Sequence, residues 1–202
     1  MATAVAEKAP GEFWVSDAPM TLEEYLALPE VEDTKRMLIR GRLWERPLMT
    51  KRNRYHSRLT IRIGYLLEVW LQKQPKPRGE VAGGEAGAII RREPVATTVG
   101  IDVAYFGPDV AANTSTGTSL YDGAPVLAVE ILSPHNTTEE MLNKAEEYLE
   151  CGSKLVWVVE PRRRTVTVYR ADAEPLMFNV RQTIDGDSSL PGLSLPVAEM
   201  FQ

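Results

Sequence analysis

The sequence predicts an α/β fold built around a strand–helix–strand unit at residues 126–160. Residues 126–132 and 154–160 are apolar runs typical of buried strands, and the segment 138–151 between them has the pattern of a helix. Such a unit favours two parallel strands joined by a right-handed crossover. Alternating apolar and polar residues at 165–170 and 177–183 add antiparallel strands after the unit.

Local signals place the ends of the central helix and of the strand that follows it. Thr137 and Glu140 have the spacing of a capping box, in which each side chain bonds the backbone N–H of the other residue. Gly152 is a helix stop, and Pro161 closes the second strand.

Further elements are expected earlier in the chain. Residues 21–29 predict a short helix that begins with a capping box of Thr21 and Glu24. Residues 37–45 alternate around a glycine as a hairpin or a bent strand does. Residues 53–73 predict a long amphipathic helix. The apolar positions on one face of that helix are Leu59, Ile63, Leu66, Leu67 and Trp70.

The other segments complete one domain at residues 21–202, preceded by a flexible tail at residues 1–20. Residues 80–91 predict a strand kinked at its glycines, and residues 99–106 predict another strand. Residues 107–123 are rich in Asn, Thr, Ser and Gly, which indicates a mobile loop. Residues 190–201 are expected to pack along the sheet. A chain of 202 residues can bury a core as a single domain.

Composition excludes several classes of protein. No run of about 18 apolar residues is present, so no transmembrane helix is expected. The first residues lack the apolar core of a signal peptide. The single cysteine, Cys151, excludes an intramolecular disulfide and a cysteine-built zinc site, and a cytoplasmic setting follows. Cys151 is interpreted as a small packing residue, with a catalytic thiol as the alternative.

Charge is distributed unevenly along the chain. The net charge of −5 argues against a generally basic nucleic-acid binder. Residues 35–62 nevertheless contain ten basic residues and one acid, Glu45, so this segment carries +9 and the remainder carries −14. Such a field can hold an anion locally. The basic segment is either a solvated face or a surface that follows a nucleic-acid backbone.

Three polar residues stand in apolar surroundings. Asp102 and Glu130 lie inside predicted strands, and Lys144 lies in the central helix. Two carboxylates on neighbouring strands can share magnesium, and a lysine can orient water or stabilise developing negative charge. The set suits metal-assisted phosphodiester hydrolysis. The structural alternatives are that Asp102 caps a turn or pairs with an arginine, that Glu130 forms an ion pair, and that Lys144 is solvated.

Seven sequence blocks together resemble the Uma family of restriction-endonuclease-like proteins, in the PD-(D/E)XK superfamily. They run from T-L-E-E-Y-L-A-L-P at residues 21–29 through D-V-A-Y-F at 102–106 and P-V-L-A-V-E-I-L-S-P-H-N-T at 125–137 to K-A-E-E-Y and G-S-K-L-V-W-V-V-E-P. The likeness covers roughly residues 21–170. It implies a restriction-endonuclease-like mixed central sheet flanked by helices, and a magnesium-dependent endonuclease acting on DNA.

The resemblance assigns the central roles by position. Asp102 and Glu130 would bind the metal, which is Mg2+ or alternatively Mn2+. The superfamily's lysine usually stands two residues after the second carboxylate, where this chain has Leu132. The family's lysine is therefore expected from the following helix as Lys144. Tyr148 lies one helical turn later and would position that lysine.

Supporting roles are implied for other residues. Glu85 would add a further acid, and Ser133 would contact substrate or end the strand. His56 opens the long helix at the family's histidine block and is a catalytic, substrate-binding or packing residue. His135 is a further candidate beside the site. Substrate DNA would be held by Arg54, Arg58 and Arg62, and cutting both strands would need a homodimer.

The first strand departs from the family pattern. Met37 stands where members tend to have an acid, and Arg40 and Arg42 stand where they tend to have acidic or amide residues. Ile101 replaces the proline before the first catalytic aspartate. The two arginines add positive charge that phosphate contacts would use. These departures motivate an alternative function: a catalytically weak or inactive nuclease fold that acts as a nucleic-acid-binding or assembly module.

Overall fold

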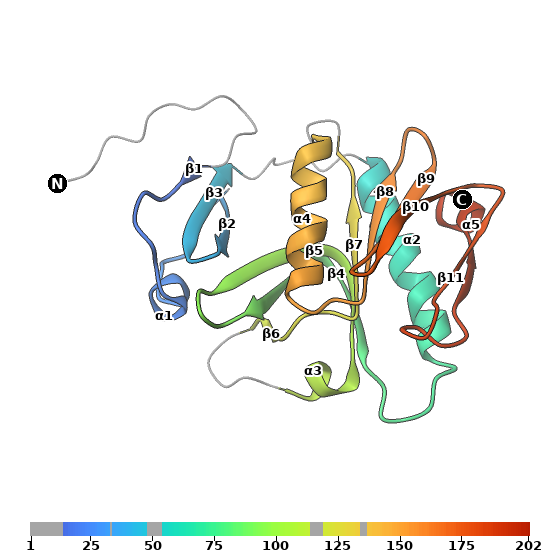
Figure 1. The fold of residues 1–202 in the computed structure, drawn as a ribbon, viewed down its shortest axis with the longest axis horizontal. Helices are drawn as coiled ribbons and strands as arrows, with labels where there is room; N and C mark the ends of the chain where they lie inside the picture. Colours follow the sequence, from blue (N-terminus) through green and yellow to red (C-terminus); the bar gives the residue numbers. More distant parts are fainter. Residues whose placement is uncertain (1–13, 33, 48–53, 114–118, 134–136) are drawn as a thin grey trace.

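The computed structural model describes residues 14–32, 34–47, 54–113, 119–133 and 137–202. A seven-stranded sheet runs through its centre in the order β10-β9-β8-β7-β5-β4-β6 (Figure 1). The strands are β4 (Glu80–Arg91), β5 (Thr97–Phe106), β6 (Tyr121–Asp122), β7 (Leu127–Ile131), β8 (Leu155–Glu160), β9 (Thr165–Arg170) and β10 (Ala173–Asn179). The pairs β7–β8 and β4–β6 are parallel and the others are antiparallel, which confirms the predicted mixed sheet.

Helices α2 (Arg54–Leu71) and α4 (Thr138–Glu150) cover opposite faces of this sheet (Figure 1). The apolar face of α2 packs in one cluster with Leu127 and Val129, whereas α4 packs in a second cluster with Ala128. Successive strand residues point to opposite faces, so this alternation along β7 separates the two layers. None of the described helices is both long and apolar enough to cross a membrane.

Helix ends follow the local signals in the sequence. Helix α1 (Leu22–Leu26) begins at Thr21 and α4 begins at Thr137, each with a complete capping box. Gly152, just after α4, has a φ of 104°, a conformation that favours glycine. The predicted apolar positions of α2 are all buried, namely Leu59, Ile63, Leu66, Leu67 and Trp70.

A separate three-stranded sheet, in the order β1-β3-β2, lies at the N-terminal end. Its strands are β1 (Trp14–Val15), β2 (Thr34–Ile39) and β3 (Arg42–Pro47). The hairpin β2–β3 turns at Gly41 as predicted, and the N–H of Leu38 donates to the Thr98 hydroxyl at 2.9 Å. The predicted tail at residues 1–20 is wrong at its end, because β1 pairs with β3. Residues 1–13 lie outside the described part of the chain.

Two predictions are wrong: the content of the loop at residues 107–123 and the bounds of the last antiparallel strand of the central sheet. Residues 107–123 contain α3 (Pro108–Ala112) and the edge strand β6, although 114–118 lie outside the described residues. The proline at the first turn of α3 suits a helix start. Strand β10 lies at Ala173–Asn179 and not at 177–183. It is an exposed edge strand, so burial imposes no alternation that would mark its start, and an edge tolerates Pro175.

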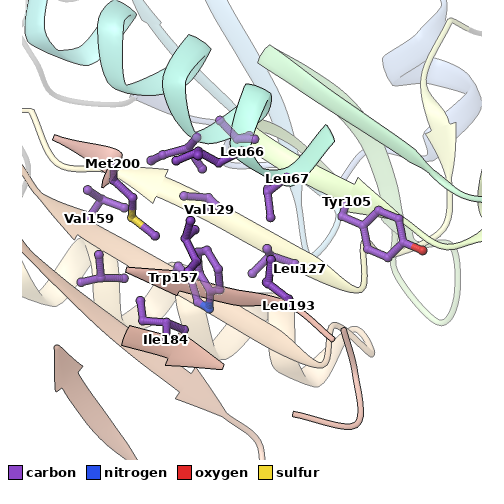
Figure 2. Packing of buried hydrophobic residues seen from close by; sticks show 14 of the residues in the cluster. Leu66, Leu67, Tyr105, Leu127, Val129, Trp157, Val159, Ile184, Leu193 and Met200 are labelled. Carbon is purple, nitrogen blue, oxygen red and sulfur yellow. The ribbon is translucent and has the colours of Figure 1, made fainter. Parts of the chain in front are cut away.

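The larger hydrophobic cluster lies between α2, the sheet and the C-terminal segment (Figure 2). That segment contains β11 (Thr183–Asp185), β12 (Ser194–Pro196) and α5 (Val197–Met200). Leu193 and Met200 are buried in the cluster, as expected for residues 190–201. Trp157 of β8 lies at its centre and is fully buried.

Candidate active site

The two predicted carboxylates lie on neighbouring strands. In the antiparallel pair β5–β7, Val103 is opposite Val129, and continuing this register by one residue sets Asp102 opposite Glu130. Directly opposed residues have Cβ atoms about 5 Å apart. Asp102 is 5% exposed and Glu130 is 6% exposed. A buried carboxylate is costly unless other groups stabilise its charge, so the partners of this acid pair decide its chemistry.

Asp102 is stabilised by groups from α2 and β7. Its Oδ2 lies 3.0 Å from His56 Nε2 and accepts the backbone N–H of Ile131 at 2.8 Å. Burial by itself raises the pKa of Asp102, but the hydrogen bond with His56 and the charge of Lys144 outweigh it and lower the pKa overall. Asp102 is therefore an anion at neutral pH, and its partners are a histidine and a backbone amide.

Glu130 is contacted by two residues of α4, the helix on the opposite face of the sheet from α2. Its Oε1 accepts the Tyr148 hydroxyl at 2.7 Å and lies 2.7 Å from Lys144 Nζ. Burial raises the pKa of Glu130, and the charge of Asp102 acts in the same direction. The two acids thus shift in opposite directions, as neighbouring carboxylates do when ionising one disfavours ionising the other.

Lys144 reaches the acid pair from helix α4. Its spacing from Tyr148 places both on one helix face, and its Nζ lies 5.8 Å from the centroid of the Tyr148 ring. Burial lowers the pKa of Lys144, but the charges of Glu130 and Asp102 raise it overall. Lys144 is therefore a cation at neutral pH. Burial also raises the pKa of Tyr148 well above its usual value, so this residue remains a hydroxyl donor.

A second lysine near the site was not predicted from the sequence. Lys35 of β2 forms an ion pair with Glu85 of β4. Glu85 lies at a β-bulge and has a φ of 71°, a rare conformation for a non-glycine residue, which redirects its side chain. Gly100 makes room for it, because a Cβ atom there would lie 2.8 Å from Glu85 Oε2. Lys144 Nζ lies 3.5 Å from the Gly100 carbonyl, so both lysines approach the same part of β5.

One signal in the sequence could have identified Lys35 as a buried lysine. Lys35 and Met37 are two residues apart on β2, so their side chains share a face of the strand. Met37 is buried, and the lysine side chain is only 12% exposed. Burial and the like charge of Lys144 lower the pKa of Lys35, whereas Glu85 opposes that shift.

The acid pair provides the carboxylate oxygens that a hard divalent cation prefers as ligands. The described residues donate hydrogen bonds to Asp102 Oδ2 and Glu130 Oε1, and none of them donates to the second oxygen of either group. Magnesium is commonly held by one or two carboxylates together with waters and substrate phosphate. No group of three or more His, Cys, Asp and Glu placed for a metal occurs among the described residues. Two carboxylates completed by water and phosphate therefore fit this site.

The arginines of the N-terminal hairpin bind groups within the protein. Arg40 donates to Glu147 and Glu150 on α4, at 2.7 Å in both cases. Arg42 donates to the backbone carbonyls of Ser16 and Asp17, at 2.9 Å in both cases. Their predicted use for phosphate contacts is therefore not supported, because these bonds fasten the hairpin to α4 and to the segment after β1.

The three arginines predicted to hold DNA lie along α2. The Arg54 guanidinium lies 4.9 Å from the centroid of the Tyr55 ring. Arg58 Nε donates to the carbonyl of Gln202 at 3.2 Å, and Arg62 Nε donates to that of Glu199 at 2.8 Å. Arg58 and Arg62 thus hold the C-terminal segment, and their contact with DNA stays a prediction. Residues 48–53, with two more of the basic side chains, lie outside the described part.

A cleft of about 760 Å³ adjoins the acid pair. His56 lines the cleft and joins it to Asp102 through their hydrogen bond. Ser133, just after β7, lines it as well, and contact of either residue with substrate stays a prediction. His135 lies outside the described residues.

Cys151 lies at the C-terminal end of α4, next to the charged contacts of the hairpin. Its thiol lies 3.8 Å from Glu147 Oε1. Burial raises the pKa of Cys151 to about 11, so the thiol is protonated at neutral pH. A catalytic thiolate is therefore disfavoured, and the interpretation as a packing residue agrees with the structure.

We expect His56→Ala to raise the pKa of the Asp102 carboxyl, because the His56 hydrogen bond is the largest contribution that lowers it. A carboxylate with a lowered pKa stabilises the fold above its unfolded pKa, and this stabilisation is lost as pH falls through the folded pKa. The variant should therefore lose stability at a higher pH during acid titration than the parent. Carbon-13 shifts of the Asp102 carboxyl and unfolding free energies at acidic pH measure both effects.

Thr60→Val is the matched control for this experiment. The Thr60 hydroxyl lies 3.5 Å from His56 Nδ1, so this substitution changes the surroundings of the ring and leaves its bond to Asp102. The Asp102 titration should then stay close to that of the parent. An unchanged pKa in His56→Ala would assign the stabilisation of Asp102 to Lys144 and the Ile131 amide.

Comparisons with known proteins agree with this fold. The family model Uma2, described as "Putative restriction endonuclease", matches residues 22–198. A solved structure described as a "putative nuclease belonging to DUF820 from Anabaena variabilis ATCC 29413" is similar over 91% of this chain and 98% of that chain. The TM-score is 0.72 at 22% sequence identity, which establishes a shared fold. No curated protein matches the chain.

Proposed function

Since the chain belongs to the Uma2 family of restriction-endonuclease-like proteins, we propose that it is a metal-dependent endonuclease that hydrolyses phosphodiester bonds in DNA. The observation that supports this most is the cluster of Asp102, Glu130 and Lys144. Two carboxylates face one another across β5 and β7, and the lysine contacts one of them at 2.7 Å. An acid pair with an ammonium group beside it suits the hydrolysis of a phosphate diester.

Asp102 and Glu130 are the residues that would hold the cation, Mg2+ or Mn2+. When bound, such a cation polarises a phosphoryl oxygen and makes a bound water more acidic. His56 keeps Asp102 charged and fixes its orientation, and the Tyr148 hydroxyl does the same for one oxygen of Glu130. These partners act as positioning residues, as hydrogen bonds to metal-binding side chains commonly do.

Lys144 acts as a fixed positive charge in this proposal. A general base must give up its proton near neutral pH, whereas the neighbouring carboxylates raise the pKa of Lys144. Its ammonium group would orient the attacking water and stabilise the negative charge that develops on the phosphate. Lys35 and Glu85 form a second ion pair whose charges act on Lys144 at longer range.

The second candidate function is a nuclease fold with weak or no cleavage that binds or assembles on nucleic acid. One observation favours it: Glu130 Oε1 is held by both Tyr148 and Lys144. A cation that needed this oxygen would have to share it with an ammonium group. The departures at Met37, Arg40 and Arg42 point the same way, because none of them supplies an acid to the site.

Titration calorimetry with Mg2+ and Mn2+, paired with a supercoiled-plasmid assay, distinguishes the two functions. We expect the parent to bind metal and to cut, and Asp102→Ala/Glu130→Ala to do neither. The control is Glu146→Ala/Glu174→Ala, which removes two exposed acids and equal charge away from the site. Metal binding without cleavage favours the second candidate function, a nuclease fold that binds or assembles on nucleic acid. No metal binding by the parent contradicts the metal site, and the light-scattering mass tests the predicted homodimer.

A further inference from the structure

We infer that the cleft beside the acid pair binds a short single-stranded segment of nucleic acid, so that cleavage occurs next to unpaired nucleotides. This inference rests on the proposed nuclease function and specifies its substrate. It is carried by the position of the cleft, its size, the arginines at its rim and its aromatic side chains.

The cleft is lined by residues next to the acid pair, although neither carboxylate is part of its lining. Its lining includes Leu132 and Ser133, which follow the strand that carries Glu130, and Met141, which lies one helical turn before Lys144. His56 lines the same cleft and contacts Asp102 at 3.0 Å. A strand lying in the cleft would therefore present a phosphate at the carboxylates without leaving the surface.

The size of the cleft selects a single strand. Its volume of about 760 Å³ lies within the range of about 300–1,000 Å³ typical of sites for small organic ligands. One or two nucleotides fill such a space. A double helix is far larger than the ligands of about this volume that such sites enclose, so it does not enter the cleft intact. Duplex DNA would have to expose an unpaired nucleotide to use the cleft.

Arg162 and Arg163 bring positive charge to the rim of the cleft. Both lie in the turn between β8 and β9 and are exposed. Within the described residues neither guanidinium forms an ion pair, unlike Arg40 on the N-terminal hairpin. Glu160 is the acid in the lining, and its carboxylate accepts the backbone N–H of Arg162 at 3.1 Å. The lining therefore keeps a net positive charge, which suits a phosphate backbone.

Aromatic side chains give the cleft faces on which bases can stack. Tyr55 at the start of α2 is 56% exposed, and Tyr169 of β9 is partly buried against the sheet. Arg54 lies over the Tyr55 ring at 4.9 Å and adds charge on that side. Proteins that bind single strands combine a basic groove with such aromatic surfaces.

The first test compares labelled oligothymidylate of about 12 nucleotides with a duplex of equal length, by fluorescence anisotropy in EDTA. The cleft lining contains neither Asp102 nor Glu130, so binding there does not require the metal. We expect the single strand to bind at least about tenfold more tightly than the duplex, since stacking acts on unpaired bases. Equal or tighter binding of the duplex, or no binding of either, overturns the inference.

Two matched pairs of variants localise the binding. Arg163→Ala is compared with Arg164→Ala, which makes the same change at the next residue but outside the cleft, where the guanidinium lies 5.7 Å from the Phe201 ring centroid. Only Arg163→Ala should lower the slope of log affinity against log salt, by about 0.7 for one lost phosphate contact. Equal effects of both arginines would indicate nonspecific attraction and overturn the inference.

Tyr55→Leu is compared with Tyr65→Leu on the same helix. Tyr65 is 57% exposed and also has an arginine over its ring, at 5.7 Å, but it lies outside the cleft. Only Tyr55→Leu should weaken single-strand binding, by about tenfold. Equal weakening by both substitutions overturns the assignment of the cleft.

The outcome for the substrate is separate from the outcome for the reaction. Plasmid cleavage in Mg2+ that depends on Asp102 and Glu130, without tighter binding of single strands, would retain the nuclease and reject the cleft. Preferential binding of single strands without cleavage would support the cleft as a binding site and contradict the proposed nuclease activity.

Discussion

Glu130→Gln should lower metal-dependent plasmid cleavage by at least about 10²–10³-fold, the range measured when one preorganised electrostatic group is removed from an active site. Glutamine keeps the shape of the side chain and an oxygen that can accept the Tyr148 hydroxyl. It removes the negative charge that a divalent cation needs and the counter-ion closest to Lys144. Cleavage rates at saturating Mg2+ and calorimetric metal affinity measure the effect.

The design of this experiment separates loss of chemistry from loss of fold. Burial raises the pKa of Glu130, so its ionisation costs more there than in water, and a neutral amide of the same shape fits the same space. We therefore expect the circular dichroism of Glu130→Gln to match that of the parent. Glu146→Gln, on the exposed face of α4, is the control for a simple change in charge. If Glu130→Gln cleaves plasmid as fast as the parent does, the assignment of Glu130 as a metal ligand is wrong.

Trp157→Ala should lower the free energy of unfolding by about 3–5 kcal/mol, the cost typical of truncating a large aromatic residue in a core. Trp157 is fully buried on β8, between Val129 of β7 and Val168 of β9 in the sheet. Figure 2 shows it surrounded by side chains from the sheet and the C-terminal segment, including Leu127 and Ile184. Urea unfolding followed by circular dichroism measures the loss.

Trp157→Phe distinguishes lost packing from other effects. The Trp157 Nε1 is buried and has no hydrogen-bond partner among the described residues. Phenylalanine removes this unpaired donor while keeping an aromatic ring, so we expect a much smaller loss than for alanine. Leu176→Ala, on the exposed edge strand β10, should change stability by less than about 0.5 kcal/mol. Similar losses for alanine and phenylalanine would contradict this expectation and show that the smaller ring recovers none of the packing of the indole.

Helix ends and the acid pair could be predicted because their signals are local. Thr21 and Thr137 carry their capping partners three residues later in the chain. Asp102 and Glu130 were recognisable because charges are rare in apolar strands. Lys144 was assigned to the site from the family resemblance, and its Nζ lies 2.7 Å from Glu130 Oε1.

Other features depend on contacts that the sequence does not display. The charge of Arg40 was expected to serve phosphate contacts, but its guanidinium binds Glu147, a residue 107 positions away. Lys35 reaches the site because Glu85 adopts a left-handed conformation at a bulge. Long-range pairing and bulge geometry decide both cases, and composition does not encode either.

The acid pair receives His56 from the helix on one face of the sheet and Lys144 from the helix on the other. Neither helix alone can complete the cluster, because each contacts a different carboxylate. In the proposed nuclease, turnover would therefore require both layers to be docked at the same moment. A local opening of α4 would withdraw Lys144 and stop the reaction while the sheet and α2 stay folded, so activity should be lost before the global unfolding transition.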